Sequence, residues 1–370
     1  MADSTATATG ATTKEDRMIN LEIVDAEAGG DIGRVIVAGF ETPPGESIAE
    51  RAEYMRENAD WLRRTLIQPP IGELSQSINL VLPPSNEEAD IGVITMGTMG
   101  YPGFSGSNAM CTIAVLASEG LIDMSADEVN IRLETPVGIT ALTVCVEDGS
   151  VKSVQYAAPV AYAEPEERTA TLPTWGAVTY TLAYSGVSYV VVDATTVDLH
   201  PTADSAEAIR RLFGELFAEI DSTTILDHPS LGAMPKLTLG LLADGSETQH
   251  YATAGQSTPL AVYMAGGVIC SGPTGTGTSA LLAWLANRKL IWPNSQICAI
   301  SPGGHTFIGD YTRDTTVGPR SAIHTTITGS PRVLKRDTIT IERPGEGSSF
   351  GGIATRERHS RSRTHGKNRG

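Results

Sequence analysis

Two distant segments of the chain carry hydroxyl and glycine residues in the same order, each directly ahead of an apolar run. The first reads SGSNAMCTIAVLASEGLI and begins at Ser105, and the second reads TGTGTSALLAWLANRKLI and begins at Thr274. Each opens with a hydroxyl residue, a glycine and a second hydroxyl residue, and each ends in a Leu-Ile pair. The match indicates an internal repeat, with one copy of the loop in each half of the chain.

These loops have the residues expected of an anion site. Past the first turn, nearly every position of each run is apolar or small, which is typical of a helix buried on all sides. The first turns would contain Gly106, Ser107 and Asn108 in one copy, and Gly275 and Thr276 in the other. Because helix N-termini present free N–H groups and partial positive charge, two of them facing one cleft would bind a carboxylate or phosphate. The alternative is that the hydroxyl residues only cap two buried helices.

Two other kinds of site are not supported. The run GTGTSA at 275–280 lacks the third glycine of a dinucleotide loop and the Lys-Ser/Thr pair of a phosphate-binding P-loop. The four cysteines, at positions 111, 145, 270 and 298, form no CxxC pair. We therefore predict no metal site and no disulfide framework, and we expect free thiols in a reducing compartment.

Length and composition set the broad class of protein. With 370 residues, two lobes are expected, and a net charge of −16 argues against a nucleic-acid-binding surface. We find no apolar run long enough for a membrane span and no secretory signal at the start, so we predict a cytoplasmic protein. Residues 1–17 and the basic segment 354–370 are predicted to be disordered tails, the latter solvated rather than bound to nucleic acid.

The elements that must position the two loops can be read coarsely. Amphipathic spacing predicts helices over 48–66 and 204–219, and Pro69–Pro70 ends the first of them. Short β-branched segments followed by turn residues predict strands at 35–38, 91–96, 142–146 and 189–193.

Several segments resemble the proline racemase family. GPTGTGTSA at 272–280 is similar to the family signature SPCGTGTSA, and GFSGSNAMC at 103–111 is similar to the first-lobe motif MCGHGTIG. DAEAGGDIGRV at 25–35 is similar to the family segment DAHTGGEPxRV. Further matches bring the resemblance to nearly the whole body, from about residue 20 to about residue 330.

The resemblance implies an α/β (α+β) fold of the diaminopimelate-epimerase-like kind. Two pseudo-symmetric lobes would each wrap a curved, mostly antiparallel sheet around a central helix, with the site between them. We expect lobe 1 at 18–195, with return strands from about 310–345, and lobe 2 at 196–330. The resemblance also implies chemistry without a cofactor, a small carboxylate substrate held by the helix N-termini, and the possibility of a homodimer.

The chain departs from the family at the positions that carry the chemistry. Ser105 and Thr274 stand where the resemblance places two catalytic cysteines, and Ser107 replaces a histidine of the first motif. Cys270 stands at a substrate-holding aspartate, and Glu27 replaces a histidine near the N-terminus. A hydroxyl is far harder to deprotonate than a thiol beside a helix N-terminus, so racemisation by two bases should be impaired.

Two more residues are candidates for the acid or base. Cys270 precedes the second loop by four residues and could act as the base, although a buried strand thiol is the competing interpretation. Cys111 falls inside the first apolar helix and is predicted to be core. His228, in DHPSLG, matches a family segment near the substrate and could act as a general acid or base, or could lie in a surface loop.

Three functions remain open at this point. Threonine at the second position resembles members that dehydrate trans-3-hydroxy-L-proline, which makes dehydration of a hydroxylated imino acid the preferred hypothesis, because elimination needs a single base at the α-carbon. An epimerase or isomerase of another small carboxylate with a rebuilt acid/base pair is the second hypothesis. The third is a catalytically inactive homologue that binds a ligand.

Overall fold

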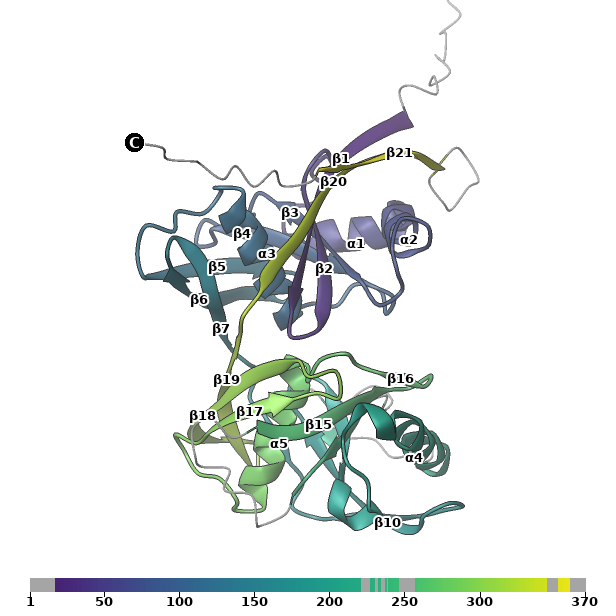
Figure 1. The fold of residues 1–370 in the computed structure, drawn as a ribbon. Helices are drawn as coiled ribbons and strands as arrows, with labels where there is room; N and C mark the ends of the chain where they lie inside the picture. Colours follow the sequence, from purple (N-terminus) through teal and green to yellow (C-terminus); the bar gives the residue numbers. More distant parts are fainter. Residues whose placement is uncertain are drawn as a thin grey trace, which may run out of the picture.

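The chain folds into two lobes, one above the other in Figure 1. The computed structural model describes residues 17–220, 227–229, 232–233, 237, 239–245, 257–344 and 352–359. The chain leaves lobe 1 after β7 (Ser150–Ala157) and returns from β19 (Arg320–Gly329) to β20 (Arg332–Glu342). Strands β7 and β19 pair with each other, with Tyr156 opposite Ile327, so one hydrogen-bonded ladder crosses the boundary between the lobes.

In lobe 1, a mixed sheet separates the buried helix α3 (Gly106–Ser118) from the helices α1 (Ile48–Asn58) and α2 (Asp60–Ile67). Side chains of β1 alternate between the two sides, as a strand requires: Leu21 and Ile23 pack with α1 and α2, and Val24 and Ala26 pack with α3. Except for the parallel pairs β2–β3 and β4–β5, the pairings described in this lobe are antiparallel. Its other strands are β1 (Met18–Ala28), β2 (Asp31–Ala38), β3 (Ser77–Leu82), β4 (Ile91–Met96), β5 (Glu128–Thr135), β6 (Gly138–Glu147) and β21 (Gly352–His359).

Lobe 2 repeats this plan around α5 (Gly275–Asn287). Val191 of β11 packs with α5, and its neighbours Val190 and Val192 pack with α4 (Ala206–Glu219) on the other side of the sheet. Short 3-10 turns lie at Ala194–Val197 and Ala203–Ser205. The strands are β8 (Tyr162–Ala163), β9 (Arg168–Leu172), β10 (Gly176–Tyr184), β11 (Ser188–Asp193), β12 (Asp227–His228), β13 (Gly232–Ala233), β14 (Leu239–Ala243), β15 (Ser257–Met264), β16 (Val268–Ile269), β17 (Gln296–Ile300) and β18 (Thr306–Val317).

Most of the predicted elements are present. All four predicted strands lie within β2, β4, β6 and β11, and the second predicted helix is α4. The first predicted helix is two helices, because the chain leaves the helical conformation at Ala59 (φ −133°). Asp60 then opens α2, where its carboxylate pairs with Arg63 and Arg64 and complements the positive end of the helix dipole.

The lobe boundary lies earlier than the predicted position at residue 195. Strand β10 pairs with β8, and β11 pairs in parallel with β14, so 162–193 belong to lobe 2. Both strands of the β18–β19 hairpin also belong to lobe 2, and the return begins at β20 rather than near residue 310. Sequence patterns do not mark the crossing, because β7 and β8 are separated by a short linker without a distinctive composition.

Part of the predicted C-terminal tail is a strand. Residues 352–359 form β21, which pairs antiparallel with β20, so 354–359 are ordered by the open edge of that strand. Residues 1–16 and 360–370 of the predicted tails lie outside the described residues. Among the helices of the described part, none has the length and apolar character needed to cross a membrane.

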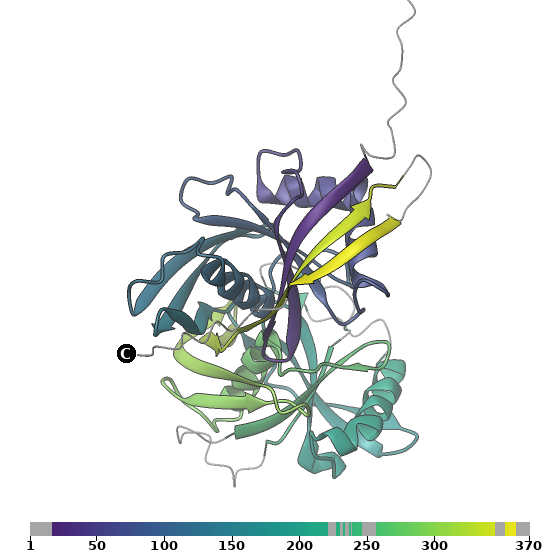
Figure 2. The ribbon, with the colours of Figure 1, turned by 45° about the horizontal axis from the view of Figure 1, so that its top comes forward.

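A buried ion pair holds the β1–β2 hairpin to the rest of lobe 1. The guanidinium of Arg34 on β2 donates to both carboxylate oxygens of Asp25 on β1, at 2.9 and 3.2 Å. It also donates to the carbonyl oxygens of Leu66, near the end of α2, and of Ile71, in the loop that follows. Arg34 and Asp25 are 1% and 2% exposed. The tip of this hairpin reaches lobe 2 in both ribbon views, so its anchoring also positions the tip (Figures 1 and 2).

Replacing Arg34 by methionine should lower the free energy of unfolding by about 3–5 kcal/mol, because the carboxylate of Asp25 would remain buried without its main partner. Urea denaturation followed by circular dichroism measures the change. The control is Arg132→Met, which breaks a pair with Asp90 whose side chains are 52% and 40% exposed; that loss should stay within about 1 kcal/mol. Equal effects of the two substitutions would contradict a structural role for the buried pair.

Candidate active site between the lobes

The N-termini of α3 and α5 meet at one phenol oxygen. A β-carbon added at Gly106, the first residue of α3, would lie 2.2 Å from the hydroxyl oxygen of Tyr156, and one added at Gly275, the first residue of α5, would lie 2.0 Å from it. Tyr156 lies on β7, the strand that crosses between the lobes, and is 4% exposed. The two duplicated loops therefore lie side by side, and both helices must begin with glycine to approach the phenol this closely.

The α3 end of the site presents Ser105 without a capping bond. Its hydroxyl does not cap the helix; instead the oxygen accepts a hydrogen bond of 2.9 Å from Nδ2 of Asn108. Asn79 donates to Oδ1 of Asn108 at 2.8 Å, and Thr95 donates to Oδ1 of Asn79 at 2.9 Å. These three hydrogen bonds all run in the same direction, from Thr95 through Asn79 and Asn108 to Ser105. The series therefore fixes the orientation of the Asn108 amide, with its N–H group toward Ser105.

An acidic residue joins the site from the β1–β2 hairpin. Oδ2 of Asp31 accepts a 2.7 Å hydrogen bond from Oγ of Ser107, whose oxygen lies 3.4 Å from Oγ of Ser105. Gly29 and Gly30 turn the chain immediately before Asp31, with φ of 57° and 93°, conformations that favour glycine. Burial raises the pKa of Asp31, although the Ser107 hydrogen bond and His305 act in the opposite direction.

Asp31 was missed by reasoning from the sequence. It lies within the segment DAEAGGDIGRV, which had been matched to a family segment as a whole without a role for its acid. The available signal was a carboxylate placed directly after a Gly-Gly turn, a position that lets a strand end approach a neighbouring loop.

The α5 end of the site is arranged differently. Thr274 has φ 52° and ψ 147°, a conformation that is uncommon for a β-branched residue and stores strain. Its hydroxyl oxygen caps the helix by accepting from the N–H of Gly277 at 2.9 Å, and it lies 3.3 Å from the Tyr189 hydroxyl. Tyr189 also bonds to Oγ1 of Thr276 at 2.8 Å. The hydroxyl of Thr274 is thus engaged in holding its own loop.

The two cysteines near the loops are held as neutral thiols. Cys270 lies at the end of β16, where its N–H donates to the carbonyl of Val262, and burial together with the charge of Asp31 raises its pKa to about 12. Cys111 is fully buried inside α3, as predicted, and burial raises its pKa strongly. Cys270 precedes Thr274 by four residues, so the thiol lies near the second loop along the chain.

His228 lies apart from the two helix N-termini. Its ring packs against those of Tyr162 and Tyr184, with centroids 5.8 and 4.6 Å away. Its neighbour Pro229 packs on Gly318, in the turn of the β18–β19 hairpin. The loops that begin at Ser105 and Thr274 thus meet at Tyr156, and the ring of His228 contacts those of Tyr162 and Tyr184 instead.

A polar groove of about 330 Å³ runs beside the hairpin tip, where the two lobes meet. Glu27 crosses it: one oxygen accepts from the N–H of Gly30 at 2.7 Å and lies 3.6 Å from Nδ1 of His305, and the other pairs with Arg332 at 2.7 Å. The tip itself touches the second loop, because a β-carbon on Gly272 would overlap the carbonyl oxygen of Gly29. Glu27 therefore ties the hairpin to lobe 2 next to the site.

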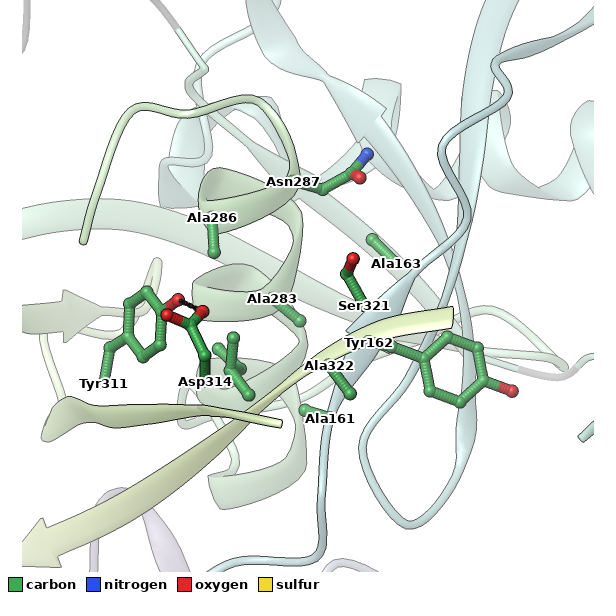
Figure 3. Close-up of a pocket in the computed structure, with 11 residues that line it drawn as sticks. Ala161, Tyr162, Ala163, Ala283, Ala286, Asn287, Tyr311, Asp314, Ser321 and Ala322 are labelled. Atoms are coloured by element: carbon green, nitrogen blue, oxygen red, sulfur yellow. Dashed lines mark hydrogen bonds between the residues drawn. The ribbon is translucent and has the colours of Figure 1, made fainter. Parts of the chain in front are cut away.

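A second cavity lies elsewhere in lobe 2 (Figure 3). It measures about 70 Å³ and lies along the middle and last turns of α5, beside Ala283, Ala286 and Asn287, with Tyr311 and Asp314 joined by a hydrogen bond at one side. Ligand pockets usually hold about 300–1,000 Å³, and none of the loop residues lines this one. Within the described ranges, no cluster of three or more His, Cys, Asp or Glu side chains is placed to bind a metal ion.

Two pseudo-symmetric lobes, each built around a buried helix that points its N-terminus at the other, define the diaminopimelate-epimerase-like class of α/β proteins. The particular family follows from the sequence. The profile of the family described as proline racemase matches residues 23–344. The chain belongs to the proline racemase family, which is a family of enzymes.

Individual relatives agree with this assignment. A protein of Chromohalobacter salexigens is 32% identical over 324 residues, which cover 87% of this chain and 89% of the relative. The trans-L-3-hydroxyproline dehydratase of Xenopus tropicalis is 26% identical and covers 87% of this chain and 92% of its own length. The crystal structure of a hydroxyproline epimerase from Agrobacterium vitis with bound trans-4-hydroxy-L-proline superposes with a TM-score of 0.75 at 27% identity, over 90% of this chain and 95% of that one.

Gly106 and Gly275 approach different atoms of Tyr156, so alanine substitutions at the two positions should respond differently to removal of the phenol oxygen. At Gly275, only the phenol oxygen would clash with an added methyl group, since the next ring atom is 3.3 Å away. At Gly106, two ring carbons would also clash, at 2.3 and 2.5 Å. Each glycine-to-alanine change should destabilise the protein by about 1–3 kcal/mol, and adding Tyr156→Phe should rescue Gly275→Ala but not Gly106→Ala.

Thermal unfolding of the two single variants, the two double variants and Tyr156→Phe alone measures this. Rescue of both alanines, or of neither, would mean that the phenol does not lie between the two helix ends in the way described.

Proposed function

We propose that the protein is a dehydratase that removes water from trans-3-hydroxy-L-proline or a similar 3-hydroxylated imino acid. The observation that carries this proposal is the unequal state of the two hydroxyls that replace the catalytic thiols. Ser105 makes no capping bond and is free to act at the α-carbon, whereas Thr274 is engaged with Gly277 and Tyr189. A site with one usable face suits an elimination, which needs one base, better than a racemisation, which needs two.

The stereochemistry of this substrate supports a one-sided site. In trans-3-hydroxy-L-proline the carboxylate and the hydroxyl lie on opposite faces of the ring, so the α-hydrogen and the hydroxyl share one face. A group on the Ser105 side could therefore act on both. Removal of the α-proton and loss of the neighbouring hydroxide would give an enamine, which tautomerises to a cyclic ketimine.

The substrate carboxylate would bind where the helices meet. Two N-terminal helix ends supply N–H groups and partial positive charge, at Gly106 and Ser107 on one side and at Gly275 and Thr276 on the other. Burial raises the pKa of Tyr156, so the phenol remains a neutral donor between them. This binding also stabilises negative charge that spreads onto the carboxylate as the α-proton leaves.

Ser105→Ala should reduce the rate of ketimine formation from trans-3-hydroxy-L-proline by about 10²–10⁴-fold, the usual contribution of a general base. Thr274→Ala should cost less, because it removes a capping and positioning hydroxyl. Nuclear magnetic resonance in deuterated water follows ketimine formation and α-proton exchange together. Binding of pyrrole-2-carboxylate, a planar mimic of the α-carbanion, measured by calorimetry, controls for loss of the site.

Three outcomes would redirect the assignment. Inversion at the α-carbon of 4-hydroxyproline without loss of water would identify an epimerase. Binding of pyrrole-2-carboxylate without any α-proton exchange in a panel of hydroxyprolines would identify a binding protein. Inactivation by Cys270→Ala, together with an unaffected Ser105→Ala variant, would identify the thiol of Cys270 as the base.

A double variant, Ser105→Cys with Thr274→Cys, should introduce α-proton exchange with inversion if the rest of the site is that of a racemase.

A further inference from the structure

We infer that Asp31 is the terminal acceptor of the α-proton in this protein, reached through the hydroxyls of Ser107 and Ser105. The inference rests on the proposed dehydration and adds the group that holds the proton while the reaction proceeds.

A serine hydroxyl cannot act as a base without a partner that takes its proton. Neither nearby thiol can do so, because Cys270 and Cys111 are buried and held protonated. Asp31 is a carboxylate in direct contact with the loop: Ser107 donates to it across 2.7 Å. It comes from a different part of the chain, the tip of the β1–β2 hairpin, and it is held against the loop by the Glu27 contacts and the Arg34–Asp25 pair.

The hydrogen bonds along this path allow both serine hydrogens to point toward the carboxylate. Asn108 donates to Ser105, so one lone pair of that oxygen is occupied and the serine's own hydrogen is available to another acceptor. The oxygen of Ser107 lies 3.4 Å away, and its hydrogen is committed to Asp31. A shortening of the contact between the two serines on substrate binding would complete the path, and contacts at reacting groups commonly tighten in the bound state.

The step balances without any further reactant. The α C–H bond breaks, its proton goes to Oγ of Ser105, the proton of Ser105 moves to Ser107, and that of Ser107 moves to Asp31. The electron pair of the C–H bond forms the double bond between the α- and β-carbons, and the C–O bond breaks with its pair on the departing hydroxide. The hydroxide takes a proton back along the same path and leaves as water, so Asp31 ends ionised as it began.

The environment of Asp31 favours such a role. The desolvation that raises its pKa makes the carboxylate a stronger base than one in water, and the negative charge of Glu27 acts in the same direction. The hydrogen bond from Ser107 and the imidazole of His305 oppose this shift. The other titratable groups on which its charge acts are held neutral by their own raised pKa values: Cys111, Tyr156, Tyr189 and Cys270.

The decisive variant is Asp31→Asn, whose amide oxygen can still accept from Ser107 but cannot take up a proton. We expect kcat for dehydration to fall by about 10²–10⁴-fold, with KM and the affinity for pyrrole-2-carboxylate changed by no more than a few-fold. Asp31→Glu should recover part of the rate. Ser107→Ala, which leaves the carboxylate in place and cuts the path, should lose kcat to a similar extent as Asp31→Asn.

The pH profile separates proton transfer from a structural role. The rate requires ionised Asp31, so kcat/KM should fall as the pH drops through its pKa, which lies above the ordinary value of 3.8. Glu27→Gln removes a repulsive charge, and the acid limb should then move to lower pH without disappearing. Asp31→Asn should retain no such limb in its residual activity.

The outcomes separate this inference from the proposed function. Native dehydration together with full kcat in either Asp31→Asn or Ser107→Ala would overturn the path while leaving the function intact. An unchanged acid limb in both Asp31→Asn and Glu27→Gln would also overturn it. If the native protein neither forms a ketimine nor exchanges an α-proton, the proposed function falls and this inference falls with it. Ser107→Ala leaves the β1–β2 hairpin unaltered. The proton path can therefore still be tested with this variant if the Asp31 variants fail to fold.

Discussion

The structure depends on one close approach: two helix ends from different lobes converge on the hydroxyl of Tyr156. That oxygen occupies the space where Gly106 and Gly275 would carry a β-carbon. Both helices are apolar on nearly every side and can exist only when a lobe closes around them. The ladder between β7 and β19 then sets how the lobes face each other, because Tyr156 itself lies in it. The positive ends of two helix dipoles are thereby concentrated at one point, where an anion would be bound most strongly.

Ion pairs in lobe 1 position the β1–β2 hairpin, whose turn lies next to the meeting point of the two helix ends. Arg34 and Asp25 hold the β1–β2 hairpin against the loop that follows α2. Glu27 ties the tip of the same hairpin to His305 and Arg332 at the lobe boundary. The β1–β2 hairpin is therefore held both at its base and at its tip. Its turn places Asp31 within hydrogen-bonding distance of Ser107, at the N-terminus of α3. Interactions that would ordinarily be described as stabilising also determine where an acidic group lies in the site.

The two copies of the repeat share the buried helix that follows the loop, but their first residues differ in backbone conformation and in hydrogen bonding. Each begins with a hydroxyl residue and a glycine, yet Ser105 accepts from an amide chain that runs through Asn108, and Thr274 caps its own helix in a strained conformation. A pair of thiols would leave two equivalent faces. Hydroxyls supported by different neighbours leave one face linked to a carboxylate and one face occupied by structural bonds, which is the physical basis for expecting chemistry on one side of the substrate.

The sequence by itself determined the two buried helices and their loops, because a run that is apolar on all sides must be covered by the rest of its lobe, and the internal repeat indicated that the two loops are equivalent. It also determined that thiols are missing from both loops. It did not determine the helix break at Ala59. Nor did it determine the lobe crossing after β7, which depends on strand pairing between segments distant in the chain. Only the tertiary structure decided the surroundings of Ser105: Asn79, Thr95 and Asp31 come from separate strands and meet there through the fold of the sheet. It also placed His228 against the rings of Tyr162 and Tyr184, since the contacts of a short segment are set by the surfaces that pack around it and not by its own residues.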